Sequence, residues 1–123
     1  MKTESQASIF SVSDLAVAKS YYLDVLGFEL DFDFEIGQYV GVKHGNVQIH
    51  LTAGDAVAER VGKGSVYIFC DEVDGYFQDV KTKGGNIFRK PADEPYMMRD
   101  FTVLDPDGNL ICLLYTSPSP RDS

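Results

Sequence analysis

Residues 28–36 read Phe-Glu-Leu-Asp-Phe-Asp-Phe-Glu-Ile, a strict alternation of apolar and acidic side chains. The apolar residues occupy the even positions, and carboxylates occupy the odd positions from Glu29 to Glu35. A period of two residues predicts a β-strand with one buried face and one acidic face in water, because a helix would mix the two sets. This strand anchors the assignment of the elements around it.

A helix is expected immediately before this strand. Ser13 and Asp14 offer an N-cap, apolar residues follow at helical spacing, and Gly27 provides a C-terminal stop. The turn 44–46 separates two apolar runs and predicts a hairpin. Further strands are expected at residues 7–12, 39–43 and 47–51. The first half therefore has the order β-α-β-β-β.

The same order returns after a glycine-containing loop over residues 52–64. A second helix is capped by Asp71 and Glu72 and ends at Gly84-Gly85. Strands are expected at residues 65–70, 86–89, 97–104 and 109–114, with a loop at 91–95. The helix stops Gly27 and Gly85 lie 58 residues apart, and the apolar positions of the two halves match at that offset. A repeated element order at a fixed offset indicates an internal duplication.

The sequence therefore predicts one α+β domain over residues 1–115. Two βαβββ modules, about 5–53 and 63–115, would form a curved mixed sheet around a cleft, with a helix on the outer face of each half. A chain of 123 residues has the size of a single domain.

The charge restricts the partners that the protein can bind. The formal net charge is −8, from 19 acidic and 11 basic residues. This surplus disfavours a nucleic acid or an anionic membrane surface, and it favours a cationic ligand. The alternative is that the acidity only keeps the protein soluble.

The chain shows no sign of a membrane span or a secretory signal. No apolar run approaches the ~20 residues that cross a bilayer, and the N-terminus lacks an apolar signal stretch. Cys70 and Cys112 belong to no Cys-x-x-Cys pair. We expect a cytoplasmic protein with both thiols reduced.

Several motifs resemble the vicinal oxygen chelate superfamily, which includes glyoxalase I, extradiol dioxygenases and bleomycin-resistance proteins. They are Val12-Ser13-Asp14-Leu15, Tyr21-Tyr22, Val25-Leu26-Gly27-Phe28, and Phe101 to Val103 with Asp105-Pro106-Asp107-Gly108-Asn109. The resemblance covers residues 7 to 111. It implies paired βαβββ modules assembled as a homodimer.

The resemblance also implies where a metal would be bound in the enzymes of this superfamily. Their four ligand positions correspond here to Ala7, His50, Ser65 and Cys112. Of these residues, only His50 is an ordinary ligand, and a divalent ion requires three or more suitable ones. We therefore expect no catalytic metal and no cofactor, although a metal could arrive with the ligand.

Residues 94–101, Glu-Pro-Tyr-Met-Met-Arg-Asp-Phe, resemble a segment of the bleomycin-resistance branch. Members of that branch sequester a drug, unchanged, in grooves between two subunits. Their ligands are cationic and carry flat heteroaromatic rings. Stacking such rings requires exposed aromatic faces, and capturing a cation requires carboxylates. The chain has 8 Phe and 7 Tyr, and it has the acidic strand face of Glu29, Asp31, Asp33 and Glu35.

Alternation predicts which side chains line the groove. Phe10, Val12, Ile49, Leu51, Val66 and Ile68 would face the helices, so Ile9, Gln48, His50, Tyr67 and Phe69 would face the cleft. The expected ligand-binding residues are Phe32, Phe34, Tyr39, Gln48, His50, Tyr67, Tyr96, Met98 and Asp100. Core packing is the alternative for Phe32 and Phe34, a satisfied buried phenol for Tyr67, and dimer packing for Tyr96 to Met98.

Other conspicuous residues have simpler explanations. Asp105, Asp107 and Asn109 suit a turn in which they bond their own backbone, rather than a metal loop. Arg99 and Asp100 could form a structural ion pair, and His44 is expected to be an exposed turn residue. The end of the chain resembles a translated sequencing adapter, with a natural Ser/Pro tail as the alternative, and we expect residues 116–123 to be disordered.

Three functions remain open. The first is non-catalytic sequestration of a cationic, partly aromatic molecule such as a bleomycin-type antibiotic, conferring antibiotic resistance. The second is a metal-dependent glyoxalase-like lyase or dioxygenase that uses His50. The third is a small-metabolite sensor of the same fold.

Overall fold

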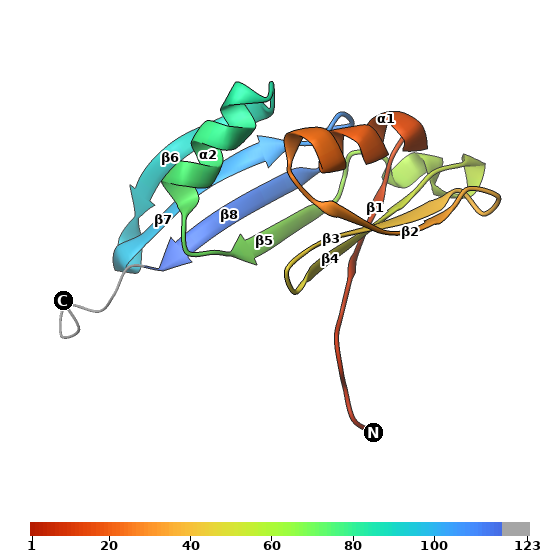
Figure 1. Cartoon of the computed structure of the whole chain (residues 1–123), viewed down its shortest axis with the longest axis horizontal. Helices are drawn as coiled ribbons and strands as arrows, with labels where there is room; N and C mark the ends of the chain where they lie inside the picture. The colour runs from red at the N-terminus through yellow and green to blue at the C-terminus, as the bar shows by residue number, and fades with distance from the viewer. Residues whose placement is uncertain (117–123) are drawn as a thin grey trace.

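The computed structural model describes residues 1–116, except for the side chain of Tyr96. The chain forms two βαβββ modules, which lie side by side along the long axis of the molecule (Figure 1). This arrangement confirms the predicted fold class and the predicted duplication of the element order.

The first module has a four-stranded mixed sheet with the order β1-β4-β3-β2. Its elements are β1 (Ser8–Ser11), α1 (Leu15–Ser20), η1 (Tyr21–Val25), β2 (Glu29–Phe34), β3 (Tyr39–His44) and β4 (Val47–Thr52). The Asp14 side chain caps α1 by accepting a hydrogen bond from the Val17 N–H. The helix then widens into the π-helical turn η1, in which the Leu26 N–H bonds the Tyr21 carbonyl.

The second module repeats this plan with the order β5-β8-β7-β6. Its elements are β5 (Ser65–Phe69), α2 (Val73–Thr82), β6 (Asn86–Glu94), β7 (Met98–Leu104) and β8 (Leu110–Thr116). Two short 3₁₀ helices, η2 (Asp55–Arg60) and η3 (Pro95–Met97), lie in the connections. Strand β6 runs through the expected loop at 91–95, and register shifts allow the longer pairing with β7.

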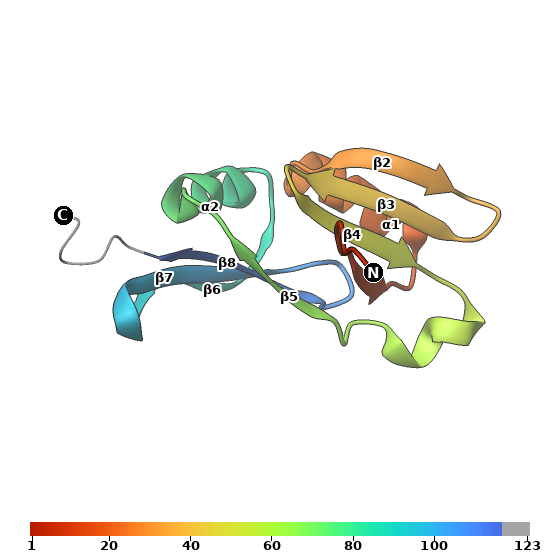
Figure 2. The ribbon, with the colours of Figure 1, turned by 90° about the horizontal axis from the view of Figure 1, so that it is seen from below.

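Each helix covers one face of its sheet, and both helices lie on the same side of the molecule (Figure 1). The residues expected to face the helices are buried, apart from half-buried Val66, which packs against the core. The opposite side, here called the open face, carries Ile9, Gln48, His50, Tyr67 and Phe69, as the alternation predicts. Seen from below, β2, β3 and β4 lie in front of α1, so α1 does not cover the open face of the first sheet (Figure 2).

Strand β2 departs from its predicted burial. It is an edge strand, and Phe32 and Phe34 remain 38% and 57% exposed. A register shift between Leu30 and Phe32 alters the pairing with β3. Asp33 lies on the helix side, where its carboxylate pairs with Lys19 of α1 at 2.5 Å. The prediction of a buried apolar face and a wet acidic face is therefore wrong for β2. Phe32 and Phe34 lie on the open face, whereas Leu30, which pairs with Val42, lies on the helix side and is 44% exposed.

The turn at residues 105–109 joins the modules. Asp105 Oδ1 accepts hydrogen bonds from the backbone N–H groups of Asp107 and Asn109, both at 2.9 Å. The Asn109 side-chain amide donates to the Ser11 carbonyl of β1 and accepts from the Gly64 N–H. The prediction of a self-bonded turn is confirmed, and the turn also ties β1 to the start of the second module.

The two ends of the chain differ in what the structure describes. Residues 1–6 are exposed, and the stretch before β1 extends away from both modules (Figure 1). At the other end, Thr116 closes β8, although it is the first residue for which disorder was expected. Residues 117–123, the rest of the expected tail, lie outside the described residues.

Candidate functional site

Three of the expected ligand-binding side chains form an aromatic group on the open face of the first sheet, here called the ring group: Phe32, Tyr39 and His50. The Phe32 and Tyr39 rings stack with their centroids 6.0 Å apart and their planes 8° apart. His50 meets both rings edge-on, at 5.1 Å and 5.3 Å. The Tyr39 hydroxyl and His50 Nδ1 also share a hydrogen bond of 3.0 Å.

A glycine in β3 leaves room for the ring group on the sheet. Gly41 of β3 pairs with both Phe32 and His50 across the sheet. A Cβ atom at Gly41 would lie 2.2 Å from Phe32 Cε1, so only a glycine lets this ring lie against the strand. Phe34 does not join the group, because its ring lies against Gly37 in the β2–β3 turn.

Two other expected residues, Met98 and Asp100, lie on β7 of the second sheet, and half-buried Met98 begins that strand. Asp100 is 9% exposed, and its Oδ2 lies 3.8 Å from Cys112 Sγ. Within residues 1–116, Asp100 Oδ1 is buried and has no hydrogen-bond partner. Burial is the main cause that raises the pKa of the Cys112 thiol, and the Asp100 charge adds to it, so this thiol is mostly protonated and reacts slowly at neutral pH.

Gln48 and Tyr67 meet at the seam between the modules. They line a pocket of about 230 Å³ together with Gln6, which precedes β1, and Ser8, which begins β1. Tyr67 is 68% exposed, so it is not the buried phenol of the alternative explanation. The side chain of Tyr96 lies outside the described part of the structure.

The expected site is therefore divided within one chain. The ring group lies on the first sheet, Gln48 and Tyr67 lie at the seam, and Asp100 lies on the second sheet. Met98 lies on the same strand as Asp100. Of the expected ligand-binding side chains that the structure describes, Phe34 alone belongs to none of these places. A single copy of the chain does not gather them around one enclosed cavity.

The four positions that correspond to metal ligands in the superfamily do not form a fitting donor set. Ala7 offers a methyl group and Ser65 a weakly donating hydroxyl, which leaves His50 and Cys112 on different sheets. No group of three His, Cys, Asp or Glu side chains suited to a metal occurs within residues 1–116. A divalent ion would need further ligands from outside this chain.

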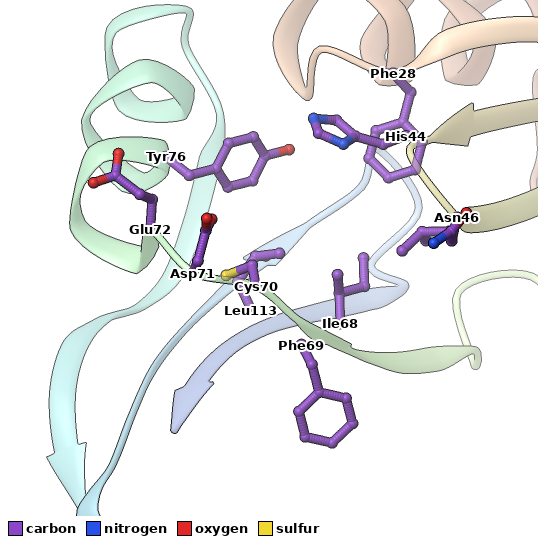
Figure 3. Close-up of a pocket in the computed structure, with 11 residues that line it drawn as sticks. Phe28, His44, Asn46, Ile68, Phe69, Cys70, Asp71, Glu72, Tyr76 and Leu113 are labelled. Carbon is purple, nitrogen blue, oxygen red and sulfur yellow. The ribbon is translucent and has the colours of Figure 1, made fainter. Parts of the chain in front are cut away.

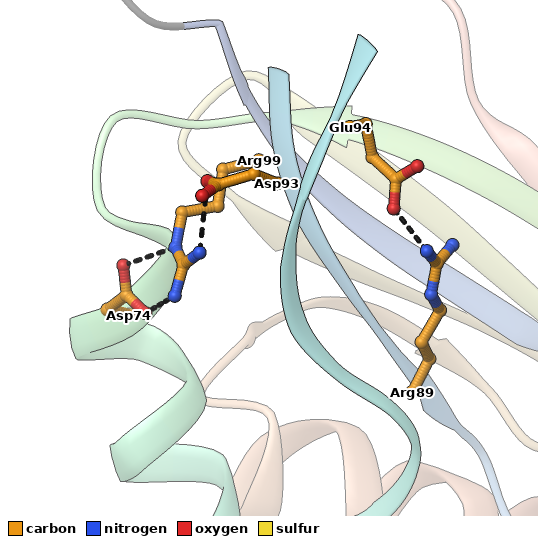
Figure 4. Close-up of polar contacts among 5 residues, drawn as sticks. All are labelled: Asp74, Arg89, Asp93, Glu94 and Arg99. Atoms are coloured by element: carbon orange, nitrogen blue, oxygen red, sulfur yellow. Dashed lines mark hydrogen bonds and ion pairs between the residues drawn. The ribbon is translucent and has the colours of Figure 1, made fainter. Parts of the chain in front are cut away.

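The expected ion pair between Arg99 and Asp100 is wrong. Arg99 bonds Asp74 of α2 through two nitrogens, both at 2.9 Å, and Asp93 of β6 at 3.1 Å (Figure 4). Consecutive strand residues point to opposite faces, so Arg99 binds the helix side while Asp100 remains on the open face. A second pair, Arg89 with Glu94, spans the bulged strand β6 (Figure 4).

Sequence reasoning missed a pocket of about 390 Å³ between the modules (Figure 3). His44 is exposed, as expected, but it is the last residue of β3 rather than a turn residue. Its ring centroid lies 5.5 Å from that of Phe28 and 6.2 Å from that of Tyr76 of α2. Cys70, Asp71 and Glu72 also line the pocket, next to Tyr76. No local pattern could reveal this pocket, because it depends on how the two modules pack together.

Solved structures share this fold at low sequence identity. TioX from Micromonospora sp. ML1 is 18% identical, with a TM-score of 0.80, and the match covers 94% of this chain and 100% of that one. The bleomycin-binding protein from bleomycin-producing Streptomyces verticillus, solved with copper(II)-bleomycin, is 21% identical, with a TM-score of 0.74 and coverages of 97% and 99%. An integron cassette protein from the mobile metagenome of V. cholerae is 23% identical, with a TM-score of 0.70 and coverages of 95% and 99%.

No curated protein sequence matches the chain. Within residues 1–116, neither α1 nor α2 nor any other helix has the length and hydropathy of a membrane span. A family model does match, over residues 7–113, nearly the whole described chain. On that match and the shared fold, the chain belongs to the Glyoxalase/Bleomycin resistance protein/Dioxygenase superfamily.

Proposed function

We propose that this protein binds and sequesters a cationic, partly aromatic small molecule, such as a bleomycin-type antibiotic, without changing it chemically. The observation that carries the proposal is the ring group, which presents stacked aromatic rings and an imidazole on a face that no helix covers. Flat heteroaromatic ligands bind such surfaces by offset stacking and edge-on contacts.

Charge supports the cationic part of the proposal. The chain has a formal charge of −8, which raises the local concentration of cations and speeds their encounter with the protein. Asp100 adds a specific acceptor on the open face of the second sheet, with one buried oxygen that lacks a partner among the described residues. A ligand donor that reached this oxygen would remove the cost of leaving it unpaired.

The complete site is proposed to lie between two copies of the chain. The ring group and Asp100 occupy different sheets, and a homodimer would bring the first module of one copy opposite the second module of the other. Phe69 and Ile9 on the open face are 75% and 61% exposed, as expected of side chains that pack against a partner. The bleomycin-binding protein of Streptomyces verticillus, solved with its copper-bound ligand, shares the fold.

Sequestration requires no cofactor, and any metal would arrive with the ligand. We propose that the protein acts in the cytoplasm, where Cys70 and Cys112 remain reduced. Its benefit to the cell would be resistance to the bound drug.

Titration calorimetry of the full chain against copper-free bleomycin and copper(II)-bleomycin tests the proposal. We expect saturable binding at micromolar protein, and about tenfold weaker binding for Phe32→Ala, because one lost stacking contact contributes about 1.4 kcal/mol. Ile36→Ala serves as the matched control, since Ile36 is 93% exposed in the β2–β3 turn, away from the ring group. Absence of saturable heat with both ligands would refute the proposal.

Elemental analysis of the purified protein distinguishes the enzymatic alternative. One nickel, zinc, manganese or iron per chain, lost in His50→Ala, would favour a metal-dependent lyase or dioxygenase. Binding of bleomycin by metal-free protein would favour sequestration.

A further inference from the structure

We propose that the pocket between the modules, here called the inter-module pocket, is a second binding site, for a small organic cation that carries an aromatic ring. The pocket has a volume of about 390 Å³, within the range of small-molecule sites. It differs from the open face on which the proposed function rests, because its floor includes Ile68 and Leu113, which point to the helix side of β5 and β8. The two regions adjoin at Phe69, which lines this pocket and also the smaller pocket of Gln48 and Tyr67.

One wall of the inter-module pocket is aromatic. Phe28, His44 and Tyr76 form a chain of edge-to-face rings that crosses from the first module to the second. The Tyr76 hydroxyl donates a hydrogen bond to the Leu26 carbonyl, which fixes the position of α2 against the end of the first helix. Figure 3 shows Tyr76 and His44 directed toward one another above the pocket. The faces and edges of such rings bind the flat aromatic ring of a ligand.

One edge of the pocket is acidic. Asp71 and Glu72 lead into α2, and both are exposed to solvent. The residues that line the pocket include no Lys or Arg. Within residues 1–116, neither carboxylate takes part in an ion pair. Asp71 points toward Tyr76, whereas the Glu72 carboxylate is directed away from His44 and Phe28 (Figure 3). Two carboxylates at this edge of the pocket, without a basic neighbour, favour a cation over a neutral or anionic molecule.

Cys70 provides a reporter inside the pocket. Its side chain is half-buried between the apolar floor and the acidic edge. Burial is the main cause that raises the pKa of this thiol, so its thiolate fraction at neutral pH is small and it reacts slowly with alkylating reagents. A bound molecule would shield the thiol from a reagent in solution. The other thiol, Cys112, lies on the open face and is removed by Cys112→Ser.

The test measures the alkylation rate of Cys70 by iodoacetamide in the full-length Cys112→Ser protein, whose fold is checked by denaturant unfolding. The probe is benzyltrimethylammonium, which is permanently charged and does not react with the reagent. We expect millimolar probe to slow alkylation by the factor 1 + [L]/Kd, and benzyl alcohol at the same concentration to have a much smaller effect.

Further substitutions locate the site. Replacing both carboxylates in Asp71→Asn/Glu72→Gln is expected to weaken protection about fivefold, because two solvent-exposed charge contacts are lost. Tyr67→Ala, on the open face, is the matched control and is expected to leave protection unchanged. This readout is independent of bleomycin binding, so the failure of one proposal does not imply the failure of the other.

Three results would overturn the inference. Alkylation that does not respond to the cation would show that nothing binds beside Cys70. Equal protection by benzyl alcohol would remove the role of the carboxylates. Loss of protection in Tyr67→Ala, with protection retained in the double carboxylate variant, would place the probe in the open-face groove.

Discussion

The hydroxyl of Tyr22 donates a hydrogen bond to Oδ2 of Asp105 over 3.0 Å, across the boundary between the two modules. Both side chains are buried, and the same oxygen of Asp105 also accepts a hydrogen bond from the Asn109 side chain at 2.8 Å. Two motifs that carry the family resemblance, Tyr21-Tyr22 and the turn at 105–109, therefore meet at the seam between the modules. Their role in this chain is to hold the modules together.

Tyr22→Phe tests this role. The substitution removes one buried hydrogen bond without changing the packed ring, so we expect the free energy of unfolding to fall by about 1 kcal/mol. Urea unfolding followed by circular dichroism measures the change. Tyr67→Phe is the control, because that side chain is 68% exposed and its hydroxyl remains hydrated. Equal unfolding midpoints for Tyr22→Phe and the wild type would contradict the proposed role.

Alkaline pH is expected to weaken the same region. Burial is the main cause that raises the pKa values of Tyr21, Tyr22 and Tyr76 above the ordinary value of 10.0. Near and above pH 10 the unfolded chain loses phenolic protons that the folded protein keeps, so stability is fully present below pH 10 and declines as the pH rises through the raised values.

Urea unfolding at a series of pH values from neutral to strongly alkaline measures this decline. The Tyr22→Phe variant has one fewer titrating group, so its free energy of unfolding should fall less steeply with pH. Parallel curves for the variant and the wild type would show that Tyr22 does not contribute to the pH dependence.

Local sequence patterns were sufficient for the elements but not for their burial. Asp14 and Gly27 mark the ends of the first helical segment, and strict alternation correctly separated Phe10 and Ile49 from Ile9 and His50. These features depend on neighbours within a few residues. The fold class followed because the same order of elements occurs twice.

The errors concern contacts between distant parts of the chain. Phe32 is partly exposed because β2 lies at the sheet edge and contains a bulge. The sequence of residues 28–36 does not determine which strand of the sheet lies at its edge. Arg99 pairs with Asp74, which lies 25 residues away on a helix of the same module. The inter-module pocket requires the packing of both modules, which sequence periodicity does not encode.

Gly41→Ala tests whether the ring group binds the ligand. The new methyl group would lie 2.2 Å from Phe32 Cε1, so the ring must swing away from the sheet. Because the ring is partly exposed, it can move at little cost in stability, and we expect about tenfold weaker bleomycin binding with a nearly unchanged unfolding midpoint. Calorimetry and urea unfolding measure the two quantities. Gly75→Ala adds the same methyl group on α2 and should leave bleomycin affinity unchanged.

Arg99→Gln tests the electrostatic link between α2 and the second sheet. The Arg99 guanidinium, through its hydrogen bonds, holds the pKa of the Asp74 carboxyl below its ordinary value of 3.8. Without that charge, the pKa should rise toward the ordinary value, which carbon-detected NMR titration of the side chain measures. Arg89→Gln removes the guanidinium that pairs with Glu94 and should leave Asp74 unaffected. No change in Asp74 upon Arg99→Gln would show that the ion pair is absent in solution.

The proposed homodimer leads to a prediction about the open face. Ile9 on β1 and Phe69 on β5 are 61% and 75% exposed in one chain, which leaves a large apolar area in water unless a partner covers it. Sedimentation of the wild type should therefore give the mass of two chains. Ile9→Ser/Phe69→Ser should give one chain and should also lose bleomycin binding, because each groove needs both copies. Ile36→Ser removes an even more exposed apolar side chain, from the β2–β3 turn, and should remain dimeric. A wild-type monomer that still binds bleomycin would refute the shared groove and would leave sequestration by a single chain.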